Sequence, residues 1–216
     1  MDKSKVGFVV AGGIMTILFL LVVNLLTSTL FIWFIYPAFG ILLLIMNIVF
    51  INNRQYKLQA VLASAFLIGF LVTVNMVHSP SYPWFIYAVF PIIWWPISAF
   101  IGRKAGTVTF ALVASTSIVL YYVILNNVMG HSYPWAIYPA FAILWWPLTL
   151  YYVRKKEYFR FSVVAATFVI LFFTTVNVVS TPHTIWAVYP MFAVLWWPLS
   201  MYYFYVKKHD RTPVEE

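Results

Sequence analysis

Long uncharged segments alternate with short basic clusters along this chain. The uncharged segments run between Lys5 and Arg54, between Lys57 and Arg103, between Lys104 and Arg154, and between Arg160 and Lys207. Each has room for a turn and two helices of about 20 residues, the length that crosses a bilayer core. The pattern therefore predicts an all-α membrane protein with eight transmembrane helices, arranged as four two-helix hairpins.

The turn of each predicted hairpin is marked by small, polar or helix-breaking residues. These groups are Thr27–Thr29, His78–Pro83, Gly130–Pro134 and Ser180–His183. Clusters of Ser, Thr, Gly and Pro interrupt helices. One helix of each hairpin is therefore expected to end at such a group and the next to begin after it.

The four hairpins are copies of one unit of 51 residues. Four residue types recur at this spacing: Asn24, Asn75, Asn126 and Asn177; Trp33, Trp84, Trp135 and Trp186; Tyr36, Tyr87, Tyr138 and Tyr189; Phe39, Phe90, Phe141 and Phe192. Residues 135–152 and 186–203 agree at 13 of 18 positions. An uninterrupted period of this length indicates internal duplication.

The predicted organisation follows this period. It comprises a cytoplasmic N-terminus (1–5), a divergent first hairpin repeat (6–54), three further hairpin repeats (55–105, 106–156 and 157–207) and a cytoplasmic tail (208–216). The first copy diverges because it has Leu43, Leu44 and Ile45 where the others have Trp-Trp-Pro.

Composition and charge placement predict a membrane location and an orientation. Hydrophobic residues make up 64% of the chain and the mean hydropathy is +0.91, too apolar for a soluble domain. All 13 Lys and Arg lie at the termini or between hairpins. Because basic loops stay in the cytoplasm, we expect a multi-pass protein of the bacterial cytoplasmic membrane with both termini cytoplasmic. The net charge of +8 favours contact with anionic lipid headgroups and not with nucleic acid.

The second helix of each hairpin is rich in aromatic residues and has internal prolines. These are Pro37, Pro91, Pro96, Pro139, Pro147, Pro190 and Pro198. A proline leaves the carbonyl four residues earlier without its helical donor, which applies to Trp135 and Ile143. In lipid such a carbonyl needs a donor from the protein, so we expect kinked helices packed against neighbours, with Tyr or Trp donors.

Two recurrent features of these helices define a candidate site. One is a stripe that passes through Tyr138, Ala142, Trp145, Thr149 and Tyr152 in the third copy, at a spacing that keeps them on one helix face. The other is the Trp-Trp-Pro sequence of the last three copies. Together with the recurrent asparagines, the candidate residues are Trp94, Trp145, Trp196, Tyr87, Tyr138, Tyr189, Ser98, Thr149, Ser200, Asn75, Asn126 and Asn177.

The candidate residues have two interpretations. Small and weakly polar residues favour close packing of membrane helices, which makes the set a packing face between repeats. Tryptophans near the expected bilayer midplane offer an N–H and a flat apolar face, which makes it a pocket for a lipid-like, aromatic or cationic molecule. The asparagines are expected to cap helices, to bond across helices or to bind a ligand.

Catalytic and metal-binding chemistry has little support in the sequence. The chain has no Cys, and the predicted spans contain no Asp, Glu, Lys or Arg. His78, His131 and His183 fall in turns at unequal distances from the following Trp. We therefore expect no catalytic residues, no metal and no cofactor, and neither an enzyme nor a proton-coupled pump.

The unit Val-Asn followed by Trp-x-x-Tyr-Pro, within a hairpin flanked by basic residues, resembles the bacterial two-transmembrane domain. That domain is often attached to sensor histidine kinases and other regulators. The resemblance implies a sensing or accessory role in the membrane, with output through a partner protein.

Three functions are compatible with these features. The first is a non-enzymatic sensory or accessory subunit of a membrane complex, with a membrane protein as its partner. The second is a small uncoupled transporter or channel for a hydrophobic, aromatic or cationic molecule, since duplicated helical units surround the path of some carriers. The third is an enzyme acting on a lipidic substrate through the His and Asn residues of the turns.

Cysteine substitutions test the predicted orientation in a chain that has no cysteine of its own. A membrane-impermeant thiol reagent added to intact cells is expected to label S132C, in an outward turn, and to leave K155C unlabelled. Labelling of K155C after lysis is the control for its reactivity, and the reverse pattern in intact cells contradicts the topology.

Overall fold

The computed structural model describes residues 2–27, 31–129 and 133–207, and the regular structure within these ranges is helical throughout. The α-helices of the described ranges are α1 (Lys3–Thr27), α2 (Ile35–Asn52), α3 (Tyr56–His78), α4 (Ile86–Ile101), α5 (Val108–Val128), α6 (Ile137–Lys155), α7 (Tyr158–Ser180) and α8 (Val188–Met201). A short 3₁₀ helix, η1 (Gly102–Gly106), follows α4, and a π-helical turn, η2 (Tyr202–Val206), follows α8.

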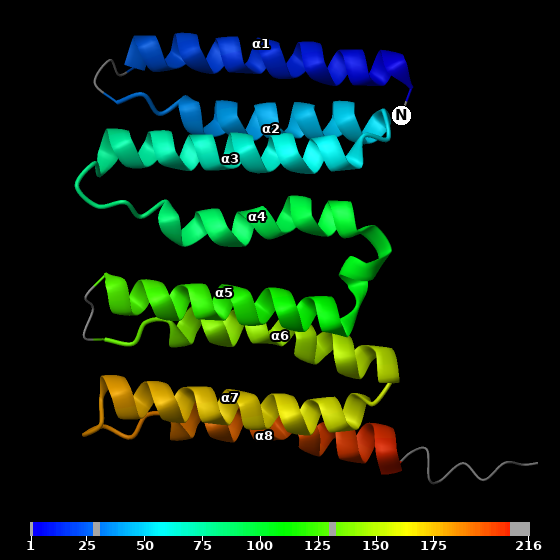
Figure 1. Ribbon diagram of the computed structural model, residues 1–216, viewed down its shortest axis with the longest axis vertical. Coiled ribbons are helices and arrows are strands. Elements are labelled where there is room, and N and C mark those ends of the chain that lie inside the picture. The colour runs from blue at the N-terminus through cyan, green and yellow to red at the C-terminus, as the bar shows by residue number, and fades with distance from the viewer. Residues whose placement is uncertain (1, 28–30, 130–132, 208–216) are drawn as a thin grey trace, which may run out of the picture. The chain divides into compact units, whose positions relative to one another are not determined.

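The chain forms two compact units, Met1–Gly102 and Arg103–Glu216. In the first unit α1 packs on α2, α2 on α3 and α3 on α4; in the second, α5 packs on α6, α6 on α7 and α7 on α8. Consecutive helices within each unit run antiparallel (Figure 1). Each helix is thus packed mainly against its neighbours in the chain.

Within the described ranges, six helical segments are long and apolar enough to cross a membrane: α1, α2, α3, α5, α7 and the segment Ile86–Gly106, which comprises α4 and η1. The other two expected spans, α6 and α8, do not reach the same length and apolarity. α6 has 19 residues, but its Trp, Tyr, Pro and basic residues lower its hydropathy. α8 has 14 residues before the helix changes to the π-helical turn η2.

Most of the buried core consists of small side chains on one face of each odd-numbered helix from α3 onward. The most buried members are Ala60, Ala63 and Ser64 in α3, Ala111, Ala114 and Ser115 in α5, and Ser162, Ala165 and Ala166 in α7. Residues spaced by three and four lie on one face of a helix, and small residues let two helix backbones approach closely. The large aromatic side chains therefore lie around this core and not within it.

The prolines fall into two groups that the sequence alone did not separate. Pro37, Pro139 and Pro190 are each the third residue of their helix, where the missing N–H has no helical acceptor to lose. The Trp135 carbonyl, which Pro139 leaves without its helical donor, accepts from the backbone N–H of Tyr138 at 3.1 Å and not from a Tyr or Trp side chain. Pro91, Pro96, Pro147 and Pro198 lie inside their helices as expected.

The carbonyl of Ile143, which Pro147 leaves without a helical donor, is bonded from the neighbouring helix. The buried hydroxyl of Ser115 in α5 donates to it at 3.4 Å. The expected Tyr or Trp donor is wrong, because the donor is this serine of the neighbouring helix. Ser64 has the same position in the second copy and is also buried, and its hydroxyl has no hydrogen-bond partner among the described residues.

The tight connections between α2 and α3 and between α6 and α7 share one geometry. Arg54 and Lys156, 102 positions apart, adopt the left-handed conformation with φ of 58° and 56°. The next N–H in each case, of Gln55 and Glu157, returns to a carbonyl five residues earlier, as in a Schellman C-cap. The connection between α4 and α5 differs, since it begins at Gly102 with φ of 63° and continues as η1.

In the first copy, the contact between the two helices of the hairpin is made by a glycine and an isoleucine instead of a serine and a proline. Gly13 occupies the position of Ser115, and Ile45 occupies that of Pro147. A Cβ on Gly13 would lie 2.6 Å from Ile45 Cδ1 and 3.1 Å from Ile41 Cγ2, whereas a Cβ on Gly12 meets nothing within 4 Å. Gly13 is therefore the residue that lets α1 approach the side chain of Ile45.

Substitution of these adjacent glycines by alanine is expected to have opposite effects on stability. Gly12→Ala should raise the free energy of unfolding by about 0.5–1 kcal/mol, because alanine favours a helix over glycine. Gly13→Ala should lower it by about 1–3 kcal/mol, because the added methyl overpacks the contact with Ile45. Thermal unfolding of both variants in detergent measures the difference, and equal shifts contradict the packing assignment.

Candidate functional site

An asparagine near the end of each odd-numbered helix is buried and hydrogen-bonds the turn that follows. In Asn24, Asn75, Asn126 and Asn177 the Nδ2 group donates to the carbonyl seven residues on, at 2.7–3.1 Å. The Oδ1 atom accepts from the N–H ten residues on, at 2.9–3.0 Å. Together, the contacts of each asparagine with its turn form an asparagine cap.

The asparagine cap supplies a side-chain hydrogen-bond acceptor for the backbone N–H at the start of each even-numbered helix. The N–H that each Oδ1 accepts belongs to the residue just before the helix, namely Phe34, Phe85, Ala136 or Ala187, and that residue makes no side-chain cap of its own. Asn75 and Asn177 also donate to the carbonyls of Ser79 and Thr181, so both of their amide hydrogens are used. The structure thus places the candidate asparagines in a capping position within the turn.

Tyrosine hydroxyls gather beside these turns and connect successive copies. Tyr133 bonds Tyr138 at 2.6 Å and Ser180, at the end of α7, at 2.8 Å. The bond with Ser180, followed by that with Tyr138, lowers the pKa of Tyr133 below its ordinary value. In the first unit Tyr36 bonds His78 at 3.0 Å across α2 and α3. Tyr87 pairs with Tyr82, and Tyr189 is largely exposed.

The two tryptophans of each Trp-Trp-Pro sequence point to different neighbours. Trp145 lies between α6 and α7, edge to face with Phe168 at 5.7 Å and Phe161 at 6.5 Å between ring centroids. Trp146 turns the other way and contacts Phe110 of α5 at 6.0 Å. Trp197 contacts Phe161 of α7 in the same manner as Trp146 contacts Phe110, at 5.4 Å. The candidate Trp94 is half-buried and Trp196 is exposed.

The contact between α6 and α7 reproduces the contact between α2 and α3. Phe141 stacks on Phe172 with 3.9 Å between ring centroids and makes a tilted contact with Phe168 at 4.8 Å. The equivalent rings of the first unit are Phe39, Phe70 and Phe66, at 3.9 and 4.9 Å. Tyr138 adds an edge contact to Phe172, as Tyr36 does to Phe70. Rings in such geometry stabilise a contact by about 0.5–1.5 kcal/mol beyond their buried area.

Sequence reasoning missed the phenylalanine partners in α3 and α7. Their signal is the pair Phe66 and Phe70, four residues apart, which recurs 102 positions later as Phe168 and Phe172. The corresponding residues of α5 are Ser117 and Tyr121, so a search at the 51-residue period does not find the pair. The division into two units falls just before that helix.

In two copies, the serine that follows the Trp-Trp-Pro sequence hydrogen-bonds a carbonyl of its own helix. Ser98 donates to the carbonyl of Trp95, and Ser200 donates to that of Trp196. Thr149 is half-buried and Ala142, on the expected stripe, is exposed. The first copy has Asn47 at this position, and its Oδ1 accepts from the Nε2 of Gln59 on α3. That cross-helix bond is a second contact that the sequence did not indicate.

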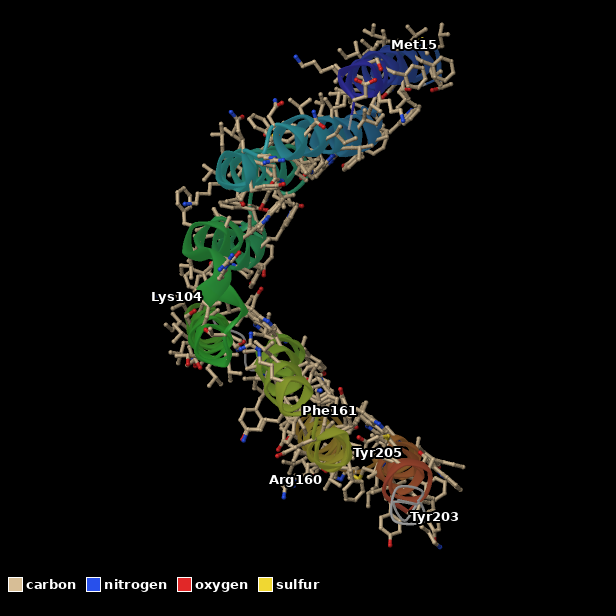
Figure 2. All side chains as sticks on the ribbon, turned by 90° about the vertical axis from the view of Figure 1, so that its right-hand side faces the viewer. Met15, Lys104, Arg160, Phe161, Tyr203 and Tyr205 are labelled. Carbon is tan, nitrogen blue, oxygen red and sulfur yellow. The ribbon has the colours of Figure 1, made fainter. Side chains whose placement is uncertain are left out.

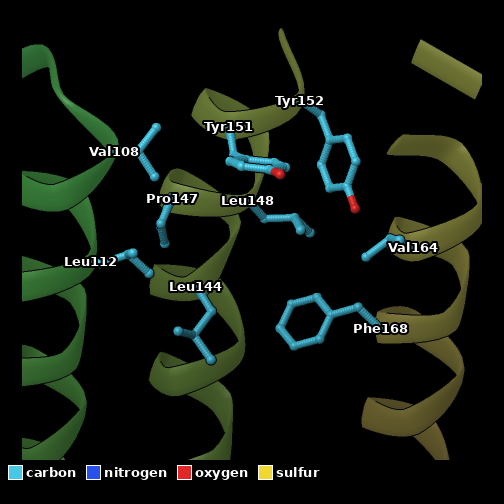
Figure 3. Close-up of a pocket in the computed structure, with 9 residues that line it drawn as sticks. All are labelled: Val108, Leu112, Leu144, Pro147, Leu148, Tyr151, Tyr152, Val164 and Phe168. Atoms are coloured by element: carbon cyan, nitrogen blue, oxygen red, sulfur yellow. The ribbon is translucent and has the colours of Figure 1, made fainter. Parts of the chain in front are cut away.

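A groove of about 400 Å³ lies along α5, α6 and α7 in the second unit. Its walls are Val108, Leu112, Leu144, Pro147, Leu148, Tyr151, Tyr152, Val164 and Phe168 (Figure 3). The groove is almost wholly apolar, and neither Trp145 nor Trp146 is among its walls. At one end the ammonium of Lys155 lies 4.4 Å from the centroid of the Tyr151 ring and donates to its hydroxyl.

The histidines of the turns have separate surroundings. His78 bonds Tyr36, His183 is exposed in the turn before α8, and His131 lies outside the described residues, as does Ser132. Among the residues that are described, no three His, Asp or Glu side chains approach one another closely enough to hold a metal ion.

These features define a helical protein with apolar helices of membrane-spanning length, aromatic rings between them and polar side chains that bond its own backbone. Comparison with protein-family models, with curated proteins and with solved structures found no match.

The adjacent residues Asn126 and Asn127 provide a matched test of the asparagine cap. Asn126→Ala removes the partners of the Tyr133 carbonyl and the Ala136 N–H and should lower the free energy of unfolding by about 1–3 kcal/mol. Asn127 is exposed and donates to the Val123 carbonyl within its own helix, so Asn127→Ala should change it little. Unfolding in detergent compares the two, and an equal loss in both variants contradicts the capping role.

Proposed function

We propose that this chain is a bacterial multi-pass membrane protein of four tandem two-helix hairpins, with both termini in the cytoplasm. In this arrangement the four asparagine caps lie on the outer side, and the connections at Arg54, at η1 and at Lys156 lie on the cytoplasmic side. The confinement of all 13 Lys and Arg to these connections and to the termini supports the orientation. Helices α6 and α8 then span the membrane in contact with protein neighbours that offset their aromatic and proline content.

We further propose that the protein is a non-enzymatic accessory or sensory subunit of a membrane complex. The observation that carries this proposal is the state of the polar candidate residues. The asparagines, Ser98 and Ser200 all bond the backbone of the protein itself, while the side chains that stay open are aromatic and aliphatic and lie on helix faces. Such faces suit lateral contact with another membrane helix. The resemblance of the repeat to the two-transmembrane domain, whose motif is complete in the first and fourth copies, agrees with a sensing role.

A second candidate function, an uncoupled carrier or channel for a hydrophobic small molecule, is favoured by the groove beside Pro147. Its volume of about 400 Å³ suits a small ligand, and its apolar walls suit a lipid-like one. The Tyr151 ring and the adjacent Lys155 give its end some polar character. An apolar groove on the side of packed membrane helices can also hold a lipid chain. The groove alone therefore does not favour transport, and we prefer the accessory role.

Purified protein in proteoliposomes separates these two functions. The accessory role predicts no flux of a lipophilic cation such as tetraphenylphosphonium above protein-free vesicles, and a complex of fixed stoichiometry with a different membrane protein in native mass spectrometry. Flux that disappears in Leu112→Trp, which fills the groove, would establish the carrier instead. Leu120→Trp is the control, since Leu120 is an exposed residue of α5 outside the groove.

A further inference from the structure

The aromatic row that joins α6 to α7 recurs on α8, where its side chains are exposed. On α6 the row is Tyr138, Phe141, Trp145 and Tyr152, and all four contact phenylalanines of α7. The residues 51 positions on are Tyr189, Phe192, Trp196 and Tyr203. Phe192 is 65% exposed and Trp196 59%, whereas Phe141 and Trp145 are half-buried. Tyr203 lies in η2, directly after α8, and is also exposed (Figure 2).

Helix α1 presents the complementary face, also uncovered. Phe8, Met15 and Phe19 occupy the positions of Phe161, Phe168 and Phe172, the three α7 residues that receive the aromatic row of α6. Met15 is 70% exposed and Phe19 64%, and Met15 points outward from α1 (Figure 2). Spacings of seven and eleven residues keep the three side chains on one face of the helix.

We propose that α8 of one copy of this chain packs against α1 of a second copy, head to tail, and repeats the α6–α7 contact. Phe192 then stacks on Phe19, Trp196 meets the thioether of Met15, and Tyr203 meets Phe8. Sulfur beside an aromatic ring is a favourable contact. Such a contact joins two different surfaces and is therefore heterologous, so copies close into a ring or extend as a chain.

The orientation of the helices permits this contact. In the proposed membrane arrangement α1 and α7 run outward and α8 runs inward, so α8 and the next α1 are antiparallel, as α6 and α7 are. Two copies in the same orientation in one membrane therefore meet without inversion. The proposal rests on this membrane arrangement and is independent of the accessory role.

Apolar exposure alone does not bring membrane helices together, because lipid covers an apolar face equally well. The recurrence of one ring arrangement points to a helix of this protein, and not lipid, as the occupant of this face. Phe39 on Phe70 and Phe141 on Phe172 have the same centroid separation of 3.9 Å in two separate units. The chain carries both halves of a third such contact, Phe192 at one end and Phe19 at the other.

Cysteine cross-linking in native membranes tests this contact. Two differently tagged full-length copies are co-expressed, one carrying Phe19→Cys and the other Phe192→Cys, and the membranes are treated with an oxidant or a short bifunctional thiol reagent. Each variant is first shown to accumulate to the parental level. The expected product is a covalent dimer that carries both tags.

Leu18→Cys in place of Phe19→Cys is the matched control. Leu18 is 57% exposed, nearly as much as Phe19, but it is turned by about 100° around the helix and should give little dimer. No dimer from the Phe19 pair, or equal dimer from the Leu18 pair, overturns the proposal. A single chain that carries both Phe19→Cys and Phe192→Cys is a further test. If it gives only monomer with an internal cross-link, α1 and α8 of the same copy meet each other, and the proposal is overturned. Labelling of S132C and K155C, done separately, shows whether the membrane arrangement itself holds.

Discussion

The asparagine cap is the contact on which each helix pair depends. A single side chain bonds the carbonyl seven residues on and the N–H ten residues on in all four copies. It therefore sets where one helix ends and where the next begins. In an apolar environment each unpaired backbone group costs several kcal/mol, and the residues before the even-numbered helices have no side-chain cap of their own. With the turn held, the small-residue face of the first helix meets the proline-containing face of the second.

Two kinds of contact then build each unit, and they use different side chains. Within a helix pair, small residues meet the neighbouring helix closely, as at Ser115 against the Ile143 carbonyl or at Gly13 against Ile45. Between pairs, stacked rings fill a wider space, as at Phe141 between Phe168 and Phe172. The Trp-Trp sequence serves both kinds, because Trp145 faces the next pair and Trp146 faces its own.

The predictions from sequence succeeded for features that depend on residue type and spacing along the chain. They failed for features that depend on which residues of a neighbouring helix are in contact. The all-helical structure, the ends of α3 at His78 and of α7 at Ser180, and the internal positions of Pro96, Pro147 and Pro198 follow from composition, turn residues and spacing. The donor to the Trp135 carbonyl is a backbone N–H and not the expected side chain, because the helix starts two residues later and the turn before it supplies this donor. The donor to Ile143 was assigned wrongly because its identity depends on the space between α5 and α6. The α7 rings that contact Tyr138 and Trp145 lie outside their own copy, so the sequence indicated a contact between copies but not which residues make it.

The sequence by itself determined the period, the apolar character and the places where helices end, because these depend on residue type and spacing along one chain. The tertiary structure decided which face of each helix meets a neighbour. Trp145 and Trp146 are adjacent and identical in type, and about 100° of rotation around the helix axis gives them different partners. Likewise, an asparagine in a turn is compatible with a ligand, a cross-helix bond or a cap. Only the distances from its amide to the backbone of the next helix select the cap, since those depend on how the chain folds back.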